Sequence, residues 1–311
     1  MFVSVFHLLA TAGNYLEPVG PIAGTERAHL IKVIWVSMIA IGPALLATPL
    51  ILWRYRRSNA RAAYTPKWEG NRLLEIIMWG VPIAVVTWLS LHIWKSTHQL
   101  DPYRPLAEEA ITVQVVGLDW KWLFLYPDQG VALVDELIVP EGQAVHLILT
   151  TDTVMQSLQI PALAGQMYAM PGMTTHQWFF AGLPGETRGF NAQFTGLGFS
   201  KQEFVVKTVT QAGFEEAMAS MQSAPPLDEA TYSKLAERGT PTETKLALGI
   251  STDATLRFRL AEPQLFARVL GRYHTGQPLA SEAQPGSADY RAEAAALPAA
   301  MNTMPMHHHH D

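Results

Sequence analysis

Methionine and histidine are the residues of this chain whose spacing could bind a metal. Met167, Met170, Met173 and His176 recur at every third position, and thioether and imidazole groups together suit Cu(I). Side chains of an extended strand alternate with a period of two, so a period of three does not keep them on one face. We therefore expect these methionines to fill gaps in a protein core, and we predict no metal site in this chain.

A second group of such residues closes the chain: Met301, Met304, Met306 and His307 to His310. These side chains could capture metal ions adventitiously. We expect a disordered tail there rather than a physiological site. The alternative function that the methionines and this tail leave open is a membrane-tethered protein that binds or carries copper.

The chain contains no cysteine. This excludes disulfides, iron–sulfur clusters, thiolate sites for zinc or copper, and a cysteine nucleophile. The net charge of -5 is mild, and no basic stripe alternates with aromatic residues as a nucleic-acid surface would require. We therefore expect no nucleic-acid partner, and we assign no catalytic side chain.

Two apolar segments near the start of the chain are long enough to cross a membrane. Val33 to Trp53 and Leu73 to Trp94 are almost uninterruptedly apolar, and each has the length, about 20 residues, at which a helix spans the hydrocarbon core. Pro43 and Pro49 are tolerated in membrane helices. We place the spans at residues 29–53 and 73–95. Two spans rather than one favour packing against another membrane protein.

The loop between the spans, residues 54–72, predicts the orientation of this hairpin. It is rich in arginine, and Glu69 is its only acid. By the positive-inside rule this loop is cytoplasmic, so both termini lie on the periplasmic face. Residues 1–28 are then an N-terminal periplasmic segment, in which residues 1–12 have the apolar stretch and small-residue end of a possible cleaved signal.

The chain after the spans predicts an all-β domain over residues 110–210. Short runs of β-branched and aromatic residues are broken there by Gly and Pro at turn-like spacing, which is typical of a sandwich or barrel. Ile111, Val113 and Val115 alternate with polar residues, which predicts a strand with one buried face.

Helical spacing returns after Thr210. One predicted helix has Asp228 as a candidate N-cap and Gly239 past its end, and a short helix is predicted from Pro263 to Tyr273. We expect a helical C-terminal extension over residues 211–275. Residues 276–311 are rich in Ala, Pro, Ser and Gln, which predicts a disordered tail.

Several strings, in the correct order, resemble subunit II of the haem-copper respiratory oxidases. They are Leu74 to Trp79 with Pro82, Gly117 to Trp122, Asp152 to Leu163, and Met170 to Gly172. The resemblance covers roughly residues 25 to 210. It implies a membrane α plus all-β fold, in which a two-transmembrane-helix hairpin precedes a cupredoxin-like β-sandwich and a helical extension.

In the cytochrome c oxidase branch of this family, two cysteines, two histidines, a methionine and a backbone carbonyl hold a binuclear copper centre. Alignment with that pattern puts a different residue at each side-chain ligand position: Gln156, Phe194, Gly198, Gln202 and Val205. Soft thiolates make such a centre possible. The resemblance therefore implies that these degenerate copper positions bind no metal.

The loss of these ligands resembles the quinol-oxidising branch, and the strings VMQSLQIP and DWKWLFLYP look closer to that branch. This implies subunit II of a proton-pumping, cytochrome bo-type ubiquinol oxidase that reduces O2 to water. Haems and copper are then expected in subunit I and no cofactor in this chain. The implied partners are subunits I, III and IV in the bacterial inner membrane, with ubiquinol and not cytochrome c as the electron donor.

Glu75 lies about one turn into the second span. In the family, an acid at this motif position lies near the mouth of a proton-uptake channel in subunit I, so the resemblance makes Glu75 a proton-uptake candidate. The helix dipole alone also favours a glutamate in a first turn, and both interpretations stay open.

Other aromatic and imidazole side chains have simpler interpretations. Without copper, Trp120 and Trp122 are expected to be buried or interfacial aromatic residues. His29, His92 and His98 lie near the span ends with no partner at ligand spacing, so we expect interfacial polar residues.

Overall fold

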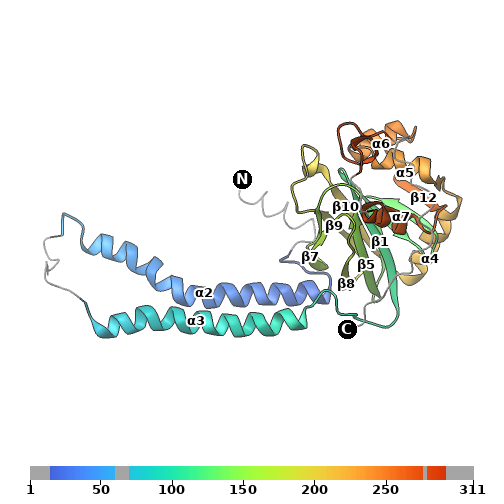
Figure 1. Ribbon diagram of the computed structural model, residues 1–311. Helices are drawn as coiled ribbons and strands as arrows, with labels where there is room; N and C mark the ends of the chain where they lie inside the picture. The colour runs from blue at the N-terminus through green and yellow to red at the C-terminus, as the bar shows by residue number, and fades with distance from the viewer. Residues whose placement is uncertain (1–14, 60–69, 276–278, 292–311) are drawn as a thin grey trace. The chain divides into compact units, whose positions relative to one another are not determined.

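The computed structural model describes residues 15–59, 70–275 and 279–291. The chain divides into two compact units, a helical unit over Thr25–Asp101 and a β unit formed by the remainder (Figure 1). The possible signal at residues 1–12 and the Met/His tail lie outside the described residues.

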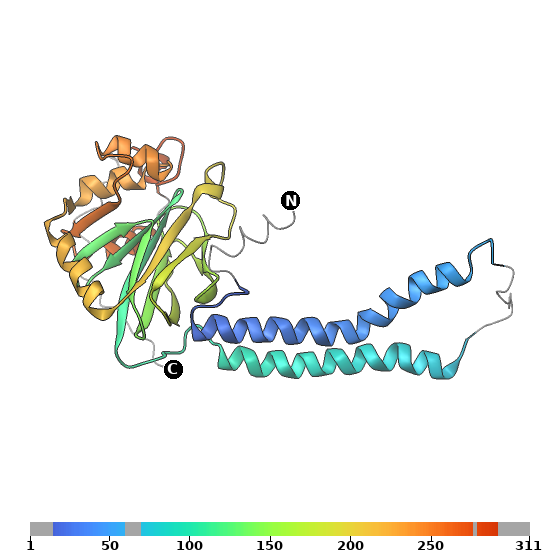
Figure 2. The same cartoon turned by 180° about the vertical axis from the view of Figure 1, so that it is seen from behind.

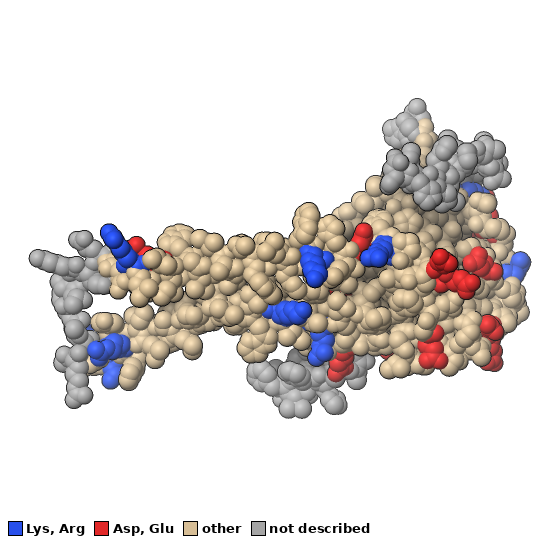
Figure 3. All heavy atoms as spheres, turned by 90° about the horizontal axis from the view of Figure 1, so that it is seen from below, with Lys and Arg blue, Asp and Glu red and all other residues tan. Residues whose placement is uncertain are grey.

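The helical unit is a hairpin of α2 (Pro21–Arg54) and α3 (Arg72–Gln99). Both helices extend beyond the spans expected at residues 29–53 and 73–95. Apolar side chains such as Trp35, Leu46 and Trp79 are exposed along them, and charged residues lie toward the hairpin ends (Figure 3). α2 bends along its length (Figure 2), as expected of a helix interrupted by Pro43 and Pro49. Such uncharged, outward-facing apolar surface is typical of helices that lie in lipid.

A polar contact joins the two helices within this apolar hairpin. His29 Nδ1 lies 3.0 Å from His92 Nε2, and Ser96 Oγ lies 3.3 Å from the same His29 nitrogen. Trp88 stacks on the His92 ring with centroids 5.0 Å apart. Sequence spacing gives no sign of this contact, which hairpin packing creates.

The β unit is a sandwich of two sheets. The larger sheet has seven strands in the order β11-β12-β3-β2-β1-β5-β8, and the smaller has five in the order β4-β10-β9-β6-β7. In chain order the first ten strands are β1 (Ala110–Leu118), β2 (Lys121–Tyr126), β3 (Val131–Val134), β4 (Glu136–Pro140), β5 (Ala144–Thr151), β6 (Gln156–Ile160), β7 (Ala164–Ala169), β8 (Thr175–Phe180), β9 (Gly185–Asn191) and β10 (Glu203–Val209).

The main core lies between the two sheets. Ile111, Val113 and Val115 of β1 point into it, as their alternation predicts, and Trp122 and Phe204 pack against each other inside it. Lys121 and Trp122 begin β2 directly after the turn from β1, which brings Gly117 opposite Trp122. The turn between β1 and β2, which follows Leu118, therefore lies at one end of the sandwich.

The C-terminal extension is not purely helical, so that expectation was incomplete. It contributes two strands, β11 (Pro226–Leu227) and β12 (Leu256–Leu260), and β12 pairs antiparallel with β3. Its helices are α4 (Gln211–Ser220), α5 (Glu229–Ala236), α6 (Pro241–Ala247) and α7 (Leu265–Gly271). Asp228 caps α5 by accepting a bond from Thr231 N at 2.8 Å, as predicted.

This extension covers the outer face of the larger sheet and forms a second core. Val116 and Leu123 of the sheet pack there with Tyr232, Phe266 and Val269 of the extension. Part of the expected disordered tail also belongs to the domain. Residues 281–283 form a short 3-10 turn, and Tyr290 donates to Ser233 O at 3.2 Å. The prediction of disorder from residue 276 onward was wrong for residues 279–291.

A buried carboxylate links the extension to the smaller sheet. Glu136 of β4 accepts bonds from Arg257 Nε and Nη2 of β12, both at 2.8 Å, and lies 2.9 Å from Lys207 Nζ of β10. Burial alone would raise the pKa of Glu136, but the bonds from Arg257 and Lys207 outweigh it and hold that pKa below its usual value. The ionised form of Glu136 is therefore favoured more strongly in the folded domain than in the unfolded chain.

This difference in pKa predicts that the folded domain loses stability in acid. Because the folded pKa of Glu136 is depressed, its contribution is fully present above the unfolded pKa and is lost as pH falls through the folded pKa. We expect about 1.5–3 kcal/mol of stability to depend on these charged bonds. Urea unfolding followed by tryptophan fluorescence at pH 7 and pH 4 should show a smaller pH-dependent loss in Glu136→Gln than in the unsubstituted chain. An unchanged pH dependence in that variant would contradict the assignment.

Candidate functional site

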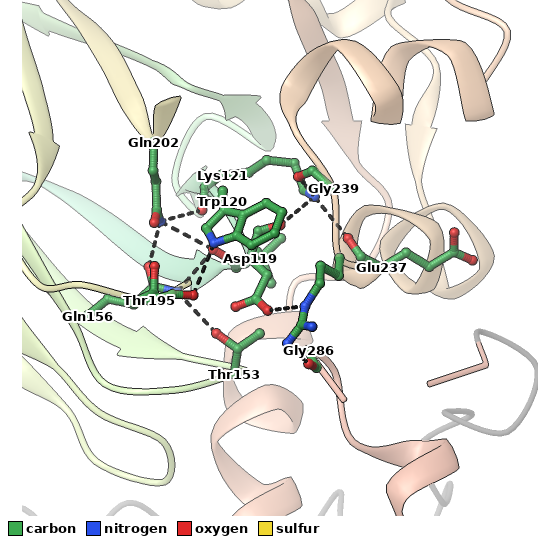
Figure 4. Close-up of polar contacts among 12 residues, drawn as sticks. Asp119, Trp120, Lys121, Thr153, Gln156, Thr195, Gln202, Glu237, Gly239 and Gly286 are labelled. Carbon is green, nitrogen blue, oxygen red and sulfur yellow. Dashed lines mark hydrogen bonds and ion pairs between the residues drawn. The ribbon is translucent and has the colours of Figure 1, made fainter. Parts of the chain in front are cut away.

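Two of the degenerate copper positions meet in the interior of the sandwich. Gln156 begins β6 and Gln202 immediately precedes β10, and neither side chain is accessible to solvent. Gln202 Nε2 donates to Gln156 Oε1 at 2.6 Å (Figure 4). The two residues that the family resemblance predicts at the histidine-ligand positions are thus bonded directly to each other.

Backbone carbonyls, the Thr153 hydroxyl and one further amide complete their hydrogen bonds. Gln156 Nε2 donates to Leu118 O at 3.0 Å and to Thr153 Oγ1 at 3.1 Å. Gln202 Nε2 also lies 3.2 Å from Leu118 O and 3.3 Å from Lys121 O. Asn191 Nδ2 donates to Gln202 Oε1 at 2.8 Å. Buried amides are costly without such partners, so this network stabilises the site.

Asn191 was not identified from the sequence, although it organises the loop beside the site. Its Oδ1 accepts from Ser157 N at 2.9 Å and from Gln193 N at 3.0 Å. We call Gln156, Asn191 and Gln202 the amide cluster. Its side chains are neutral and their oxygens already accept hydrogen bonds, so the cluster as folded offers no anionic or imidazole ligand to a cation.

The other three degenerate positions do not join the cluster. Phe194 is 72% exposed and Val205 is half-buried on β10. Gly198 packs closely against Trp120, since a Cβ built at Gly198 would lie 2.0 Å from an atom of that ring. A side chain at position 198 could be accommodated only if Trp120 moved.

Trp120 is held between this loop and the C-terminal extension. Its Nε1 donates to Thr195 O at 3.1 Å, and the Arg238 guanidinium lies over the ring, 5.9 Å from its centroid. Arg238 also pairs with the buried Asp119 at 3.2 Å. Trp122 is fully buried in the core. The expectation that both tryptophans are buried or interfacial agrees with these positions.

A buried lysine ties the extension to the strand beside the amide cluster. Lys121 Nζ donates to the backbone oxygens of Asp119, Glu237 and Gly239 at 2.8–2.9 Å (Figure 4). Burial lowers the pKa of Lys121 to about 8, against the attraction of nearby carboxylates. The ammonium is therefore charged at pH 7 and is satisfied by three carbonyls.

A second buried charge, Asp152, lies four residues before Gln156 in the loop that leads to β6. Arg272 Nη1 lies 3.0 Å from its Oδ2, Tyr232 OH donates to Oδ2 at 2.6 Å, and Tyr273 OH donates to Oδ1 at 3.0 Å. Burial raises the pKa of Asp152 to about 6, although Arg272 opposes the shift. The carboxylate is ionised at pH 7, and it fixes the extension to this loop.

The methionine group does not form one face. Met167 is buried in the core, as expected, whereas Met173 is 53% exposed. His176 contacts another imidazole, His146. Within residues 15–59, 70–275 and 279–291, no group of three or more His, Cys, Asp or Glu side chains is placed to hold a metal ion.

Glu75 lies in the first turn of α3 and is exposed. The helix begins here because Asn71 caps it, accepting bonds from Leu73 N at 2.9 Å and from Leu74 N at 3.4 Å. An acid at this position complements the helix dipole. The geometry is compatible with both interpretations of Glu75.

Comparison with known proteins gives consistent results. Residues 130–209 match the family model described as cytochrome c oxidase subunit II, periplasmic domain. The cytochrome bo(3) ubiquinol oxidase subunit 2 of Pseudomonas putida is 35% identical over 93% of this chain and 90% of its own. The ubiquinol oxidase subunit 2 of Acetobacter aceti is 36% identical over 85% of this chain and 83% of its own.

More distant relatives carry similar descriptions. The quinol oxidase subunit 2 of Bacillus spizizenii is 33% identical over 71% of this chain and 71% of its own. Among solved structures, the periplasmic domain of subunit II of cytochrome oxidase of Bradyrhizobium japonicum covers 37% of this chain at 20% identity, with a TM-score of 0.36.

Proposed function

Because this chain belongs to the cytochrome bo(3)-type ubiquinol oxidase subunit 2 family, whose members are membrane subunits with a periplasmic domain, we propose that it is the non-catalytic subunit of a proton-pumping oxidase. That complex oxidises ubiquinol and reduces O2 to water in the aerobic respiratory chain. This subunit carries no binuclear copper centre, and its role is structural.

The amide cluster is the observation that carries this proposal. Gln156 and Gln202, which the family resemblance predicts at the positions of the two histidine ligands, bond to each other at 2.6 Å in the interior. The binuclear copper centre of the cytochrome c oxidase branch depends on soft thiolate ligands, and the chain contains no cysteine. At Gly198, which the resemblance predicts at a cysteine position, the Trp120 ring occupies the volume that a side chain would need. Hydrogen bonding between neutral amides thus replaces metal coordination as the force that holds these loops.

The placement of the chain follows from the same proposal. Residues 54–72 form a cytoplasmic loop of the bacterial inner membrane, and both termini and the domain at residues 110–210 are periplasmic. The haems and copper reside in subunit I, and subunits III and IV complete the complex. Arg54, Arg56, Arg57 and Arg72 at the loop ends of the two helices support this orientation.

Purification of the detergent-solubilised complex through this subunit tests the proposal. Haem absorption bands, about one copper per complex, and oxygen uptake with ubiquinol but not with reduced cytochrome c are the expected results. Turnover with reduced cytochrome c, or copper in excess of the subunit I site, would overturn it. Isolation without haem would favour a copper carrier instead.

We further propose that Glu75 takes part in proton uptake. Its position in the first turn of α3 supports this role, because that end of the helix adjoins the arginine-rich loop and therefore the cytoplasmic face. Ionisable side chains within membrane spans commonly mark proton pathways.

Glu75→Gln is expected to slow quinol-driven oxygen reduction several-fold, since the amide keeps the size of the side chain but cannot carry a proton. Haem content and co-purification of the complex should not change. Glu109→Gln is the matched control, because Glu109 is an exposed acid in the segment between α3 and β1. Equal turnover in the Glu75→Gln and Glu109→Gln complexes would remove the proposed role.

A further inference from the structure

Two histidines of the larger sheet face each other away from the amide cluster. His146 lies on β5 and His176 on the edge strand β8, which pairs with it antiparallel. Val145 and Leu147 on either side of His146 are fully buried in the main core. Alternation along the strand therefore directs His146 to the opposite, outer face of the sheet, where both imidazoles are half-buried.

Neighbouring aromatic rings hold the two imidazoles in place. His146 Nε2 lies 2.9 Å from His176 Nδ1. Trp178, two residues along β8, stacks on the His146 ring with centroids 4.1 Å apart and planes 9° from parallel. Tyr103 meets the His176 ring edge-on at 5.8 Å. The two facing nitrogens are thus positioned by both the sheet register and aromatic packing.

We propose that His146 and His176 together bind one divalent transition-metal ion of the zinc type, with water completing its coordination. Imidazole nitrogen is a preferred ligand of such ions. Zinc at 2.0–2.1 Å from each of two nitrogens, at a tetrahedral angle, holds those nitrogens roughly 3.3 Å apart. The present separation is 2.9 Å, so a small rotation of the imidazoles admits the ion, and the χ2 torsion of histidine is soft.

The protonation state of the pair suits a metal ligand. Burial lowers the pKa of His146 to about 4, with His176 adding to the shift, and burial also lowers the pKa of His176. Both shifts favour the neutral imidazole, which is the form that binds a metal ion. When the ion binds, the ring that donates the shared hydrogen bond changes tautomer, so both facing nitrogens present a lone pair and no net proton is released.

This site does not depend on the role of the subunit in quinol oxidation. His146 and His176 lie on the larger sheet, whereas Gln156 belongs to β6 of the smaller sheet and Gln202 immediately precedes β10 of that sheet. The metal-binding test can therefore succeed or fail whatever the electron donor of the complex.

Zinc binding to the purified complex tests the site. The four tail histidines are first replaced (H307A, H308A, H309A and H310A) so that they cannot contribute. Bound zinc is then measured by equilibrium dialysis and mass spectrometry, which distinguishes zinc from the iron and copper of the complex. His146→Ala and His176→Ala are compared with His274→Ala, an exposed histidine of the extension.

We expect His146→Ala and His176→Ala each to bind one zinc ion fewer per complex. The zinc affinity of the site should fall at least about tenfold, because even changes to the outer-shell partners of a metal ligand weaken binding by that factor. His274→Ala should bind zinc as tightly as the complex that carries only the four tail substitutions. Zinc X-ray absorption should count two imidazole nitrogens in the background complex. Equal zinc binding in all three variants, with haem spectra intact, would overturn the proposal, as would a spectrum without imidazole ligands.

Discussion

Asp152→Ala is expected to lower the free energy of unfolding of the β domain by about 3–5 kcal/mol, the usual cost of leaving one member of a buried ion pair without its partner. Arg272 is only 4% exposed and pairs with Asp152 at 3.0 Å. Tyr232 would lose its acceptor at the same time, whereas Tyr273 would keep its bond to the backbone oxygen of residue 152. Urea unfolding of the detergent-solubilised chain, followed by tryptophan fluorescence, measures the loss.

Two further variants make the result specific. Combining Asp152→Leu with Arg272→Met removes both charges and should recover much of the stability, because apolar replacement of a buried pair is often neutral. Glu203→Ala breaks the exposed Arg188–Glu203 pair, whose side chains are 66% and 54% exposed, and should cost less than about 1 kcal/mol. A loss in Asp152→Ala no greater than in Glu203→Ala would show that the Asp152 pair does not hold the extension.

Gln202→Leu is expected to destabilise the domain by about 2–4 kcal/mol without changing the copper content of the complex. The substitution keeps the volume of the side chain but removes the donor to Gln156 Oε1 and the acceptor from Asn191 Nδ2. Each buried polar group left without a partner costs about 1–3 kcal/mol. Copper analysis and urea unfolding of the same preparation measure both parts.

Gln211→Leu is the matched control for this variant. Gln211 bonds to Glu215 on the exposed surface of α4, so its loss should stay within about 0.5 kcal/mol. If Gln202→Leu lowered the copper content while the haem content stayed constant, Gln202 would be a metal ligand and the proposed absence of the copper centre would be wrong.

Local patterns in the sequence predict most of the fold. Hydropathy alone identifies both membrane helices, because lipid requires about 20 consecutive apolar residues. Alternation predicts the buried face of β1, and the Asp228 cap follows from local hydrogen bonding. These signals lie within a few residues of the structures that they specify.

The contacts that were not predicted join residues far apart in the chain. Asp152 and Tyr273 are 121 positions apart, Lys121 and Gly239 are 118 apart, and His29 and His92 are 63 apart. No periodicity links such pairs, since only tertiary packing brings them together. Strand β12 was missed for the same reason: its five residues become a strand by pairing with β3.

The position of β12 has a consequence for how the domain folds. Strand β3 pairs with β2 on one side and with β12 on the other, and Val134 lies opposite Leu256. During synthesis the N-terminal part of a chain emerges first. Until Leu260 has emerged, β3 is an open edge strand, which is a template for pairing with another chain.

Closing this edge also requires a loop of more than 100 residues between paired strands, which slows folding relative to local pairing. A chain terminated before Leu256 would retain the residues of the main core but present β3 and the apolar outer face of the sheet. Newly made subunits are therefore most prone to aggregation in the interval before their last strand arrives.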